Sequence, residues 1–261
     1  MKKLNKIDLR NTVEKLINTF FEAGKIAKEI NLRGAKVTIK SDKSPVTDAD
    51  LAIDKILRNK ITNLTPDIPI ISEETVDIKV KNISKTFWLI DPIDGTRDYI
   101  NKREEYTLNA ALIIDLIPAI GIIYAPEKNR LFFSYGKNLA FEKNNEKTIK
   151  LNCKKKNKNE IIGLENSGNT PSEIWNIYKK YKVTKTVKMS SSLKFCIIAA
   201  GEADIYAANA RAFEWDIAAG HAILEHAGGT VTTHEEKKFL YGKQDYKNLP
   251  IIAKRVEILN K

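Results

Sequence analysis

Two aspartates three residues apart, Asp91 and Asp94, lie in the stretch FWLIDPIDGTRDYI, residues 87–100. An apolar run that reads as a buried strand ends at the first of them. Positions i and i+3 share a face of a helical turn, so a first turn after this strand would point both carboxylates at one small volume. Two like charges there need a cation, and hard oxygen ligands favour Mg²⁺ or Mn²⁺ over Zn²⁺.

Gly95 and Thr96 follow directly and supply a complementary group. The N-terminus of a turn or helix presents unpaired backbone N–H groups, and a glycine there lets a phosphate approach the chain closely. One short motif could therefore hold both a metal and a phosphate. Asp, Pro and Gly are also turn formers, so the motif alone leaves a capped turn equally open.

Another carboxylate follows a neighbouring strand. Ile68–Ser72 reads as a short strand that ends at Glu73 and Glu74, and residues 86–90 read as the strand that ends at Asp91. If the two strands are parallel neighbours, these carboxylates meet at one edge of the sheet, where ligands of α/β proteins collect. The spacing does not choose between Glu73 and Glu74.

Asp216 is a further candidate, in EWDIAAGHAILEHAGG. The pattern predicts a helix over residues 216–227 with Asp216 as its N-cap, which is a sufficient structural role by itself. An N-cap carboxylate can also coordinate a metal. The small residues Ala218, Ala219 and Gly220 indicate that this end of the helix packs tightly against another element.

Asp50 follows Thr47 at the spacing of a capping box. If Asp50 lay near the other carboxylates, it could take a proton from a metal-bound water, and Thr96 could orient that water. Spacing alone shows neither role. The sequence has no GxxxxGK[ST], GxGxxG, HExxH or GxSxG motif, which disfavours covalent or zinc-based mechanisms.

The elements that must position these residues alternate along the chain. The apolar periodicity predicts an opening helix over residues 7–30, a helix over residues 51–61, and strands at 106–114, 119–124 and 130–134. The polar, lysine-rich stretch 141–160 is typical of a solvated surface connection between two subdomains. Beyond it we expect helices at 172–181 and 192–200 and a strand at 203–208.

Composition excludes several classes of protein. A chain of 261 residues with a formal net charge of +11 holds one large domain or two small ones. Its lysines are scattered, so charge alone is weak support for a nucleic-acid-binding protein, which remains an outside alternative. Two cysteines suit a reducing cytoplasm, and no run approaches the roughly 18 apolar residues of a membrane span.

Four blocks of the sequence resemble a known family. PVTDADLAID, IPIISEE, WLIDPIDGTRDYI and WDIAAGHAILEHAGG, in this order and spacing, are similar to the magnesium-dependent, lithium-sensitive phosphomonoesterases of the inositol monophosphatase superfamily. The blocks TLNAALI, GIIYAP and SSLKFCIIAAGEADIY are most similar to its bacterial CysQ-type 3'(2'),5'-bisphosphate nucleotidase branch. The resemblance runs through nearly the whole chain.

The resemblance implies roles for single residues. Asp50, Thr96 and Glu73 would be catalytic, and Glu73 rather than Glu74 would be a metal ligand. The implied metal ligands are Glu73, Asp91, the carbonyl of Ile93, Asp94 and Asp216. The implied substrate-binding residues are Asp94, Gly95, Thr96, Ser191, Ser192, Lys194 and Asp216.

The resemblance also implies fold and activity. We expect a layered αβαβα sandwich of α+β and α/β character, as in inositol monophosphatase and fructose-1,6-bisphosphatase, with subdomains 1–148 and 149–261. The activity would be hydrolysis of the 3'-phosphate of adenosine 3',5'-bisphosphate to AMP, and of its sulfated precursor. An inositol-phosphate or sugar-phosphate phosphatase is the alternative on this scaffold.

The same resemblance predicts cofactors and partners. Two or three Mg²⁺ ions would bind, Mn²⁺ would substitute, and Li⁺ and Ca²⁺ would inhibit. The partner would be a phosphorylated nucleotide, with no nucleic acid. We expect a cytoplasmic monomer or homodimer, with peripheral association at the inner membrane left open.

Two departures from the branch pattern concern substrate recognition. Ser190 stands where the branch usually has a glycine before two serines, and Ala210, Arg211 and Ala212 stand where it usually has Gly-Pro-Thr. Neither touches the metal motif. Arg211 could supply a contact to the second phosphate of the substrate.

Overall fold

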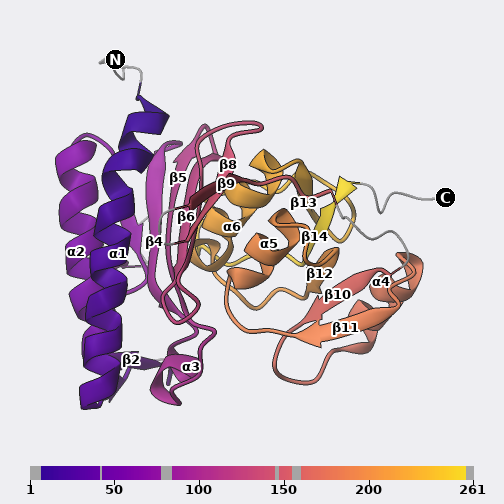
Figure 1. Ribbon diagram of the computed structural model, residues 1–261, viewed down its shortest axis with the longest axis horizontal. Coiled ribbons are helices and arrows are strands. Elements are labelled where there is room, and N and C mark those ends of the chain that lie inside the picture. The colour runs from indigo at the N-terminus through magenta and orange to yellow at the C-terminus, as the bar shows by residue number, and fades with distance from the viewer. Residues whose placement is uncertain (1–6, 42, 78–83, 145–146, 155–159, 257–261) are drawn as a thin grey trace.

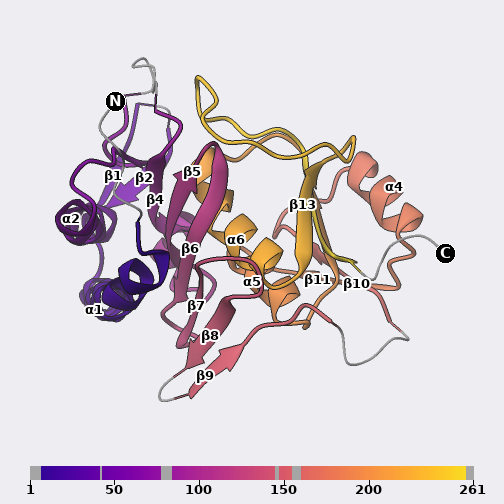
Figure 2. The ribbon, with the colours of Figure 1, turned by 90° about the horizontal axis from the view of Figure 1, so that it is seen from above.

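Helices and sheets alternate in five layers across the molecule (Figure 1). The computed structural model describes residues 7–41, 43–77, 84–144, 147–154 and 160–256. Helices α1 (Leu9–Arg33) and α2 (Asp48–Leu64) form the first layer, and α5 (Leu193–Ala199) and α6 (Glu214–His226) lie between the two large sheets. Helix α4 (Ser172–Lys180) covers the outer side of the second sheet (Figure 2). This confirms the expected αβαβα sandwich.

The first large sheet has seven strands in the order β3-β4-β5-β6-β7-β8-β9. β3 and β4 are parallel, and every other neighbouring pair is antiparallel. Its strands are β3 (Ile70–Ser72), β4 (Phe87–Asp94), β5 (Thr107–Ile114), β6 (Ile117–Ala125), β7 (Arg130–Ser134), β8 (Ala140–Asn144) and β9 (Lys147–Lys150). Helix α3 (Thr96–Ile100) follows β4 directly.

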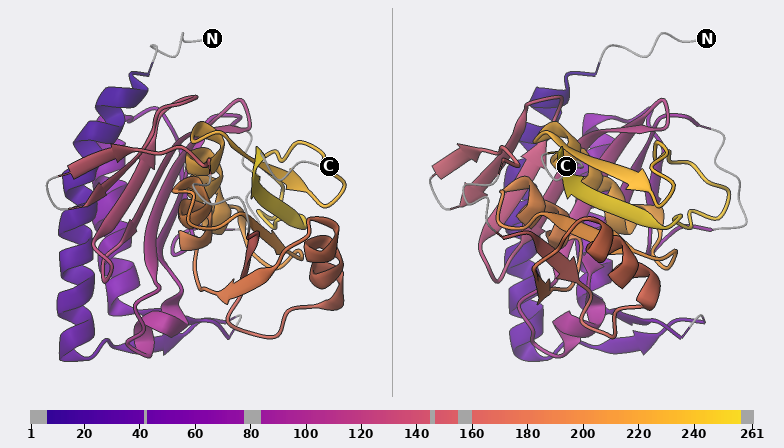
Figure 3. Two further views of the ribbon diagram at one scale, coloured as in Figure 1. Left: turned by 45° about the vertical axis from the view of Figure 1, so that its right-hand side comes forward. Right: turned by 90° about the vertical axis from the view of Figure 1, so that its right-hand side faces the viewer.

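The second large sheet has five strands in the order β11-β10-β12-β14-β13, and it is mixed. β10 is parallel to β11 and β12, whereas β14 is antiparallel to β12 and β13. Its strands are β10 (Ile162–Glu165), β11 (Lys185–Lys188), β12 (Ile205–Ala208), β13 (Gly229–Thr233) and β14 (Ile251–Arg255). Figure 3 shows this sheet and α4 beside the other layers. A small hairpin of β1 (Val37–Ile39) and β2 (Pro45–Thr47) completes the fold.

Two apolar cores hold the first sheet in place because successive side chains of a strand face opposite sides. On β4, Trp88 and Ile90 pack with α1 and α2, whereas Phe87 and Leu89 pack with α5 and α6. Both faces of the strand are buried, so residues 87–90 of β4 are continuously apolar rather than alternating.

The sequence expectation for residues 141–160 needs correction. The stretch 141–160 is not only a surface connection, since β8 and β9 within it extend the first sheet. Lys143, Lys147 and Lys150 are themselves paired residues of these two strands, and a polar edge strand carries no apolar signal. Most of KKKNKNE lies outside the described residues, which omit 155–159. No described helix is both long enough and apolar enough to span a bilayer.

Candidate active site

Three carboxylates from distant parts of the chain meet at one end of the first sheet. Glu73, Asp91 and Asp216 each offer an oxygen atom, and these atoms lie within 4.8 Å of one another. Glu73 follows β3, Asp91 lies in β4, and Asp216 lies in the first turn of α6. The sequence analysis named all three, and Glu74 is not part of this group.

Parallel pairing of β3 and β4 brings the first two carboxylates together. Ser72 pairs with Ile90, and the backbone N–H of Glu73 donates to the carbonyl of Ile90 at 3.1 Å. The expected arrangement of parallel neighbours is therefore confirmed. Because the carboxyl ends of parallel strands lie at one edge of a sheet, Glu73 just after β3 and Asp91 in the second half of β4 lie close together.

The expected helical turn at Asp91 and Asp94 is wrong. β4 continues through Asp94, with Asp91 opposite Asn109 and Asp94 opposite Thr107 on β5. The pairing is irregular between them, and such an irregularity bends a strand and redirects its side chains. An irregularity in the pairing of β4 with β5, rather than a helical turn, therefore positions the two carboxylates.

Asp216 is also not the N-cap of its helix. Helix α6 begins at Glu214, and Asp216 is the third helical residue, where its Oδ2 accepts a hydrogen bond at 2.8 Å from the backbone N–H of Phe213. This hydrogen bond to the backbone of the N-cap residue holds the carboxylate at the helix start. The expected tight packing is found, since Gly121 of β6 lies directly against the backbone of Ala219.

The cluster concentrates negative charge out of water. Burial, followed by the charges of neighbouring carboxylates, raises the pKa of Asp91 and of Asp216 well above the ordinary value. Asp91 Oδ1 is buried and has no hydrogen-bond partner among the described residues. An unpartnered buried carboxylate oxygen and a set of hard oxygen donors fit a divalent cation such as Mg²⁺.

Asp94 faces the same cavity as Glu73 and Asp216, but other residues hold it in place. Its Oδ2 accepts a short hydrogen bond from the backbone N–H of Ser192, at the start of α5. Burial raises its pKa, which the nearby ammonium of Lys194 partly offsets. Lys194 is itself buried and donates to the carbonyls of Met189 and Ser191 at 3.2 and 2.7 Å. These contacts join the two halves of the chain at the site.

Asp50 lies beside Thr96, the residue with which α3 begins. It forms the predicted capping box with Thr47, and its Oδ1 is 3.4 Å from Thr96 Oγ1. Thr96 Oγ1 also donates to the carbonyl of Ile93 at 3.1 Å. Burial, opposed by the hydrogen bonds from Thr47, raises the pKa of Asp50 to about 6.

Lys40, from the turn between β1 and β2, contacts the carboxylates, and no pattern in the sequence indicated this contact. Its Nζ lies 3.3 Å from Glu73 Oε1 and 2.8 Å from Glu74 Oε1. Burial, partly offset by Lys40, raises the pKa of both glutamates. This pairing could not be found from spacing, because it depends on where the hairpin folds.

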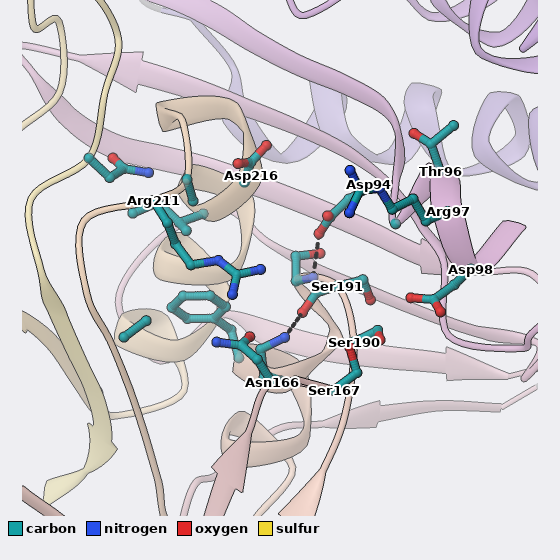
Figure 4. Close-up of a pocket in the computed structure, with 18 of the residues that line it drawn as sticks. Asp94, Thr96, Arg97, Asp98, Asn166, Ser167, Ser190, Ser191, Arg211 and Asp216 are labelled. Carbon is teal, nitrogen blue, oxygen red and sulfur yellow. Dashed lines mark hydrogen bonds between the residues drawn. The ribbon is translucent and has the colours of Figure 1, made fainter. Parts of the chain in front are cut away.

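A cavity of about 500 Å³ opens beside the carboxylates (Figure 4). The predicted site residues that line it are Glu73, Asp94, Gly95, Thr96, Ser191, Ser192, Lys194 and Asp216. Asp50, Asp91 and Ile93 do not line it and lie behind this wall. The two departures from the branch pattern also face the cavity, through Ser190, Arg211 and Ala212.

Sequence reasoning missed the opposite wall. It is formed partly by Asn166 and Ser167, which follow β10, and by Tyr206 of β12. Tyr206 donates its hydroxyl to Asn166 Oδ1 at 3.1 Å. Short strands of the second sheet have few residues and ordinary compositions, so only the sheet order shows that these residues face the carboxylates.

Comparisons with known proteins agree with this architecture. The sequence profile described as the Inositol monophosphatase family matches residues 8–257. The 3'(2'),5'-bisphosphate nucleotidase CysQ of Buchnera aphidicola subsp. Acyrthosiphon pisum is 36% identical over 242 residues, which are 89% of this chain and 90% of that protein. The 3'(2'),5'-bisphosphate nucleotidase CysQ of Escherichia coli O157:H7 is 33% identical over 80% of this chain and 85% of that protein.

Solved structures give the same result. CysQ from Bacteroides thetaiotaomicron, a bacterial member of the inositol monophosphatase family, superimposes with a TM-score of 0.79 at 28% identity. The match covers 96% of this chain and 99% of that chain. An inositol monophosphatase from Anabaena shares the fold with a TM-score of 0.71 at 22% identity, over 94% of this chain and 90% of that chain. This chain therefore belongs to the inositol monophosphatase family.

Proposed function

We propose that this chain is a metal-dependent 3'(2'),5'-bisphosphate nucleotidase, which hydrolyses the 3'-phosphate of adenosine 3',5'-bisphosphate to AMP and inorganic phosphate. The carboxylate cluster at the wall of a cavity of about 500 Å³ carries this proposal. The names of the relatives that match most of the chain support the nucleotide substrate. The sulfated precursor of the bisphosphate is a second substrate that we propose.

In this proposal, Glu73, Asp91 and Asp216 hold the cation, with Asp94 and the carbonyl of Ile93 as further ligands by family resemblance. A divalent cation held there supplies positive charge that offsets the charge of the reacting phosphate and acidifies a water molecule. The cofactor is Mg²⁺, as two or three ions; Mn²⁺ substitutes for it, and Li⁺ and Ca²⁺ inhibit.

The remaining residues bind substrate and move a proton. Asp50 Oδ1 accepts the proton of the attacking water, and Thr96 Oγ1, 3.4 Å away, orients that water. With a pKa of about 6, Asp50 is mostly ionised at pH 7 and can act as a base. The backbone of Gly95 and Thr96 holds the scissile phosphate, and Ser191, Ser192 and Lys194 line the nucleotide pocket.

We further propose that the site forms between subdomains 1–148 and 149–261, in a cytoplasmic monomer or homodimer. The hydrogen bond from the Ser192 N–H to Asp94 supports this proposal, because it joins a residue of the second subdomain to a residue of the first. An inositol-phosphate or sugar-phosphate phosphatase is the alternative, because a fold does not choose the leaving group.

The test compares two substrates. Phosphate release is measured with adenosine 3',5'-bisphosphate and with inositol 1-phosphate, in the presence of Mg²⁺ and after chelation, for wild type and Asp94→Asn. The proposal expects magnesium-dependent preference for the nucleotide, with 5'-AMP as product, and a folded but inactive variant. Preference for inositol 1-phosphate would contradict the substrate, and full activity of Asp94→Asn would contradict the site.

A further inference from the structure

The cavity that carries the carboxylates is also lined by cationic side chains. They are Arg97, Arg103, Lys194 and Arg211. A nucleoside bisphosphate brings two strongly anionic groups into this cavity. The metal ions that the carboxylates hold in the proposed function neutralise only the phosphate that is cleaved. The second phosphate needs a counter-charge of its own, since an unpaired charge in a partly buried site is costly.

Two of these four cations are already engaged. Arg103 pairs with Asp98 at 3.1 Å, and Lys194 donates to two backbone carbonyls. Arg97 and Arg211 line the cavity, and their side chains make no hydrogen bond or ion pair with any described residue. The choice for a second anion therefore lies between two free guanidinium groups.

Arg97 lies next to the group that reacts. It follows Thr96 in α3, where the proposed function places the scissile phosphate. The ribose of a nucleoside 3',5'-bisphosphate holds its two phosphates apart, so both cannot occupy this end of α3. Arg97 is therefore poorly placed for the second phosphate.

Arg211 lies on the other side of the cavity. It belongs to the segment between β12 and α6, and its guanidinium points into the cavity on the side of Asn166 and Ser191 (Figure 4). It also lines a smaller adjoining cavity of about 70 Å³, which shares Asn166 and Asn209 with the large one. The cavity therefore continues past Arg211, which leaves room for a group bound there.

The charges around Arg211 favour an anion. Lys194 faces the same cavity, and its pKa is lowered to about 8, chiefly by burial and in part by the positive charge of Arg211. Asp94 lies close to Lys194 and offsets part of the repulsion between the two cations, whereas Arg211 forms no ion pair with any described residue, so its charge is still open to an anion. A guanidinium with all its N–H groups free binds phosphate through two parallel hydrogen bonds.

We propose that Arg211 binds the phosphate that is not cleaved and thereby sets the preference for bisphosphates over monophosphates. This specificity role rests on the proposed function. Arg211 is a substrate-binding residue in this inference and takes no part in the transfer itself.

The test is the ratio of kcat/KM for adenosine 3',5'-bisphosphate to kcat/KM for adenosine 3'-monophosphate. It is measured for wild type, Arg211→Gln, Arg211→Lys, Arg97→Gln and Lys247→Gln. Lys247 is an exposed cation next to Asn248 that does not line the cavity, so its removal controls for the loss of one charge. A charge-assisted, bidentate contact predicts a ratio about 10–100-fold lower in Arg211→Gln.

Arg211→Lys should recover part of the ratio, because it restores the charge without the bidentate geometry. Arg97→Gln should keep the wild-type ratio, because Arg97 lies beside the 3'-phosphate that both substrates carry. Lys247→Gln should keep it within about twofold, because Lys247 is exposed and does not line the cavity. A wild-type ratio in Arg211→Gln, or a larger loss of the ratio in Arg97→Gln, overturns the assignment of Arg211. Wild type that hydrolyses neither nucleotide overturns the proposed function instead.

A binding measurement separates recognition from turnover. 5'-AMP carries only the phosphate that is not cleaved, and its dissociation constant can be measured by calorimetry with wild type and Arg211→Gln. The inference expects about 10-fold weaker binding or more in the variant. Equal binding of 5'-AMP by the two proteins would contradict it.

Discussion

Thr96 Oγ1 lies within hydrogen-bonding distance of Asp50 Oδ1, at 3.4 Å, and of the carbonyl of Ile93, at 3.1 Å. One hydroxyl thus links the first turn of α2 to the end of β4. Both partners are acceptors, so the hydroxyl proton can serve only one of them at a time. The other partner is then open to a proton from a water molecule, which is the arrangement that a base and an orienting hydroxyl require.

Asp50→Asn should therefore lower kcat by about 10²–10⁴-fold, the usual contribution of general acid–base catalysis. The amide keeps the size of the side chain but cannot accept the proton. Asp48→Asn is the matched control, since Asp48 lies in the same turn and is partly exposed. Steady-state kinetics decide the matter, and an Asp50→Asn enzyme that loses no more activity than Asp48→Asn would exclude the role.

Removal of charge from the carboxylate cluster should stabilise the metal-free protein. Burial raises the pKa of Asp91 in the folded state, so the folded state binds more protons than the unfolded state. Stability of the metal-free protein therefore falls as pH rises from the ordinary pKa of 3.8 through the raised pKa. Asp91→Asn removes this cost, and its Tm in chelator at pH 7 should exceed that of wild type.

The same variant should lose its response to metal. A ligand at 100 times its Kd adds about 2.7 kcal/mol, which corresponds to a Tm increase of roughly 5–10 °C for a chain of this size. Thermal unfolding with and without Mg²⁺ measures this shift. An Asp91→Asn protein with the wild-type Mg²⁺ shift would show that Asp91 does not hold the cation.

Lys194 should make substrate binding sensitive to alkaline pH. Burial lowers its pKa to about 8, so its ammonium is present at pH 7 and is lost as pH rises above 8. Because the substrate is anionic, KM should rise between pH 7 and pH 9. Lys194→Met should have a high KM at pH 7 that changes little over this range, and an identical pH profile in both proteins would argue against Lys194 as a binding residue.

Gly121 should be required for the contact between β6 and α6. A Cβ at this position would lie 2.3 Å from the carbonyl oxygen of Ala219, a backbone atom that cannot move alone. Gly121→Ala should destabilise the protein by about 1–3 kcal/mol, as overpacking does. Gly168→Ala is the control, since nothing lies within 4 Å of its added Cβ. Urea unfolding compares the two, and equal stability would contradict the contact.

The sequence predicted the carboxylates of the site because they follow local rules. Glu73 comes directly after a short apolar strand, and Asp91 follows four buried residues of β4. Strand ends of this kind can be read from apolar runs and the polar residues that close them. The prediction of a helical turn at Asp94 was wrong for the same reason, because an apolar run followed by Asp-Pro is typical of the end of a strand. Only the pairing with β5 shows that β4 continues to Asp94.

Neither the contacts of Lys40 nor the cavity wall opposite the carboxylates could be predicted in this way. Lys40 reaches Glu73 across a hairpin, and Tyr206 faces the carboxylates because β12 lies in a second sheet. These relationships depend on the order of strands and on the packing of α5 and α6 between the sheets. Arg211 illustrates the point, since its departure from the branch pattern is visible in the sequence but its free guanidinium is visible only in the fold.

The most direct measurement is magnesium-dependent phosphate release from adenosine 3',5'-bisphosphate by Glu73→Gln and Glu74→Gln. The two residues are adjacent and both contact Lys40, but only Glu73 shares the carboxylate cluster. The account predicts that Glu73→Gln loses about 10²-fold or more, as loss of a group that positions the reacting atoms does, while Glu74→Gln stays near wild type. Equal activities of the two variants would contradict it.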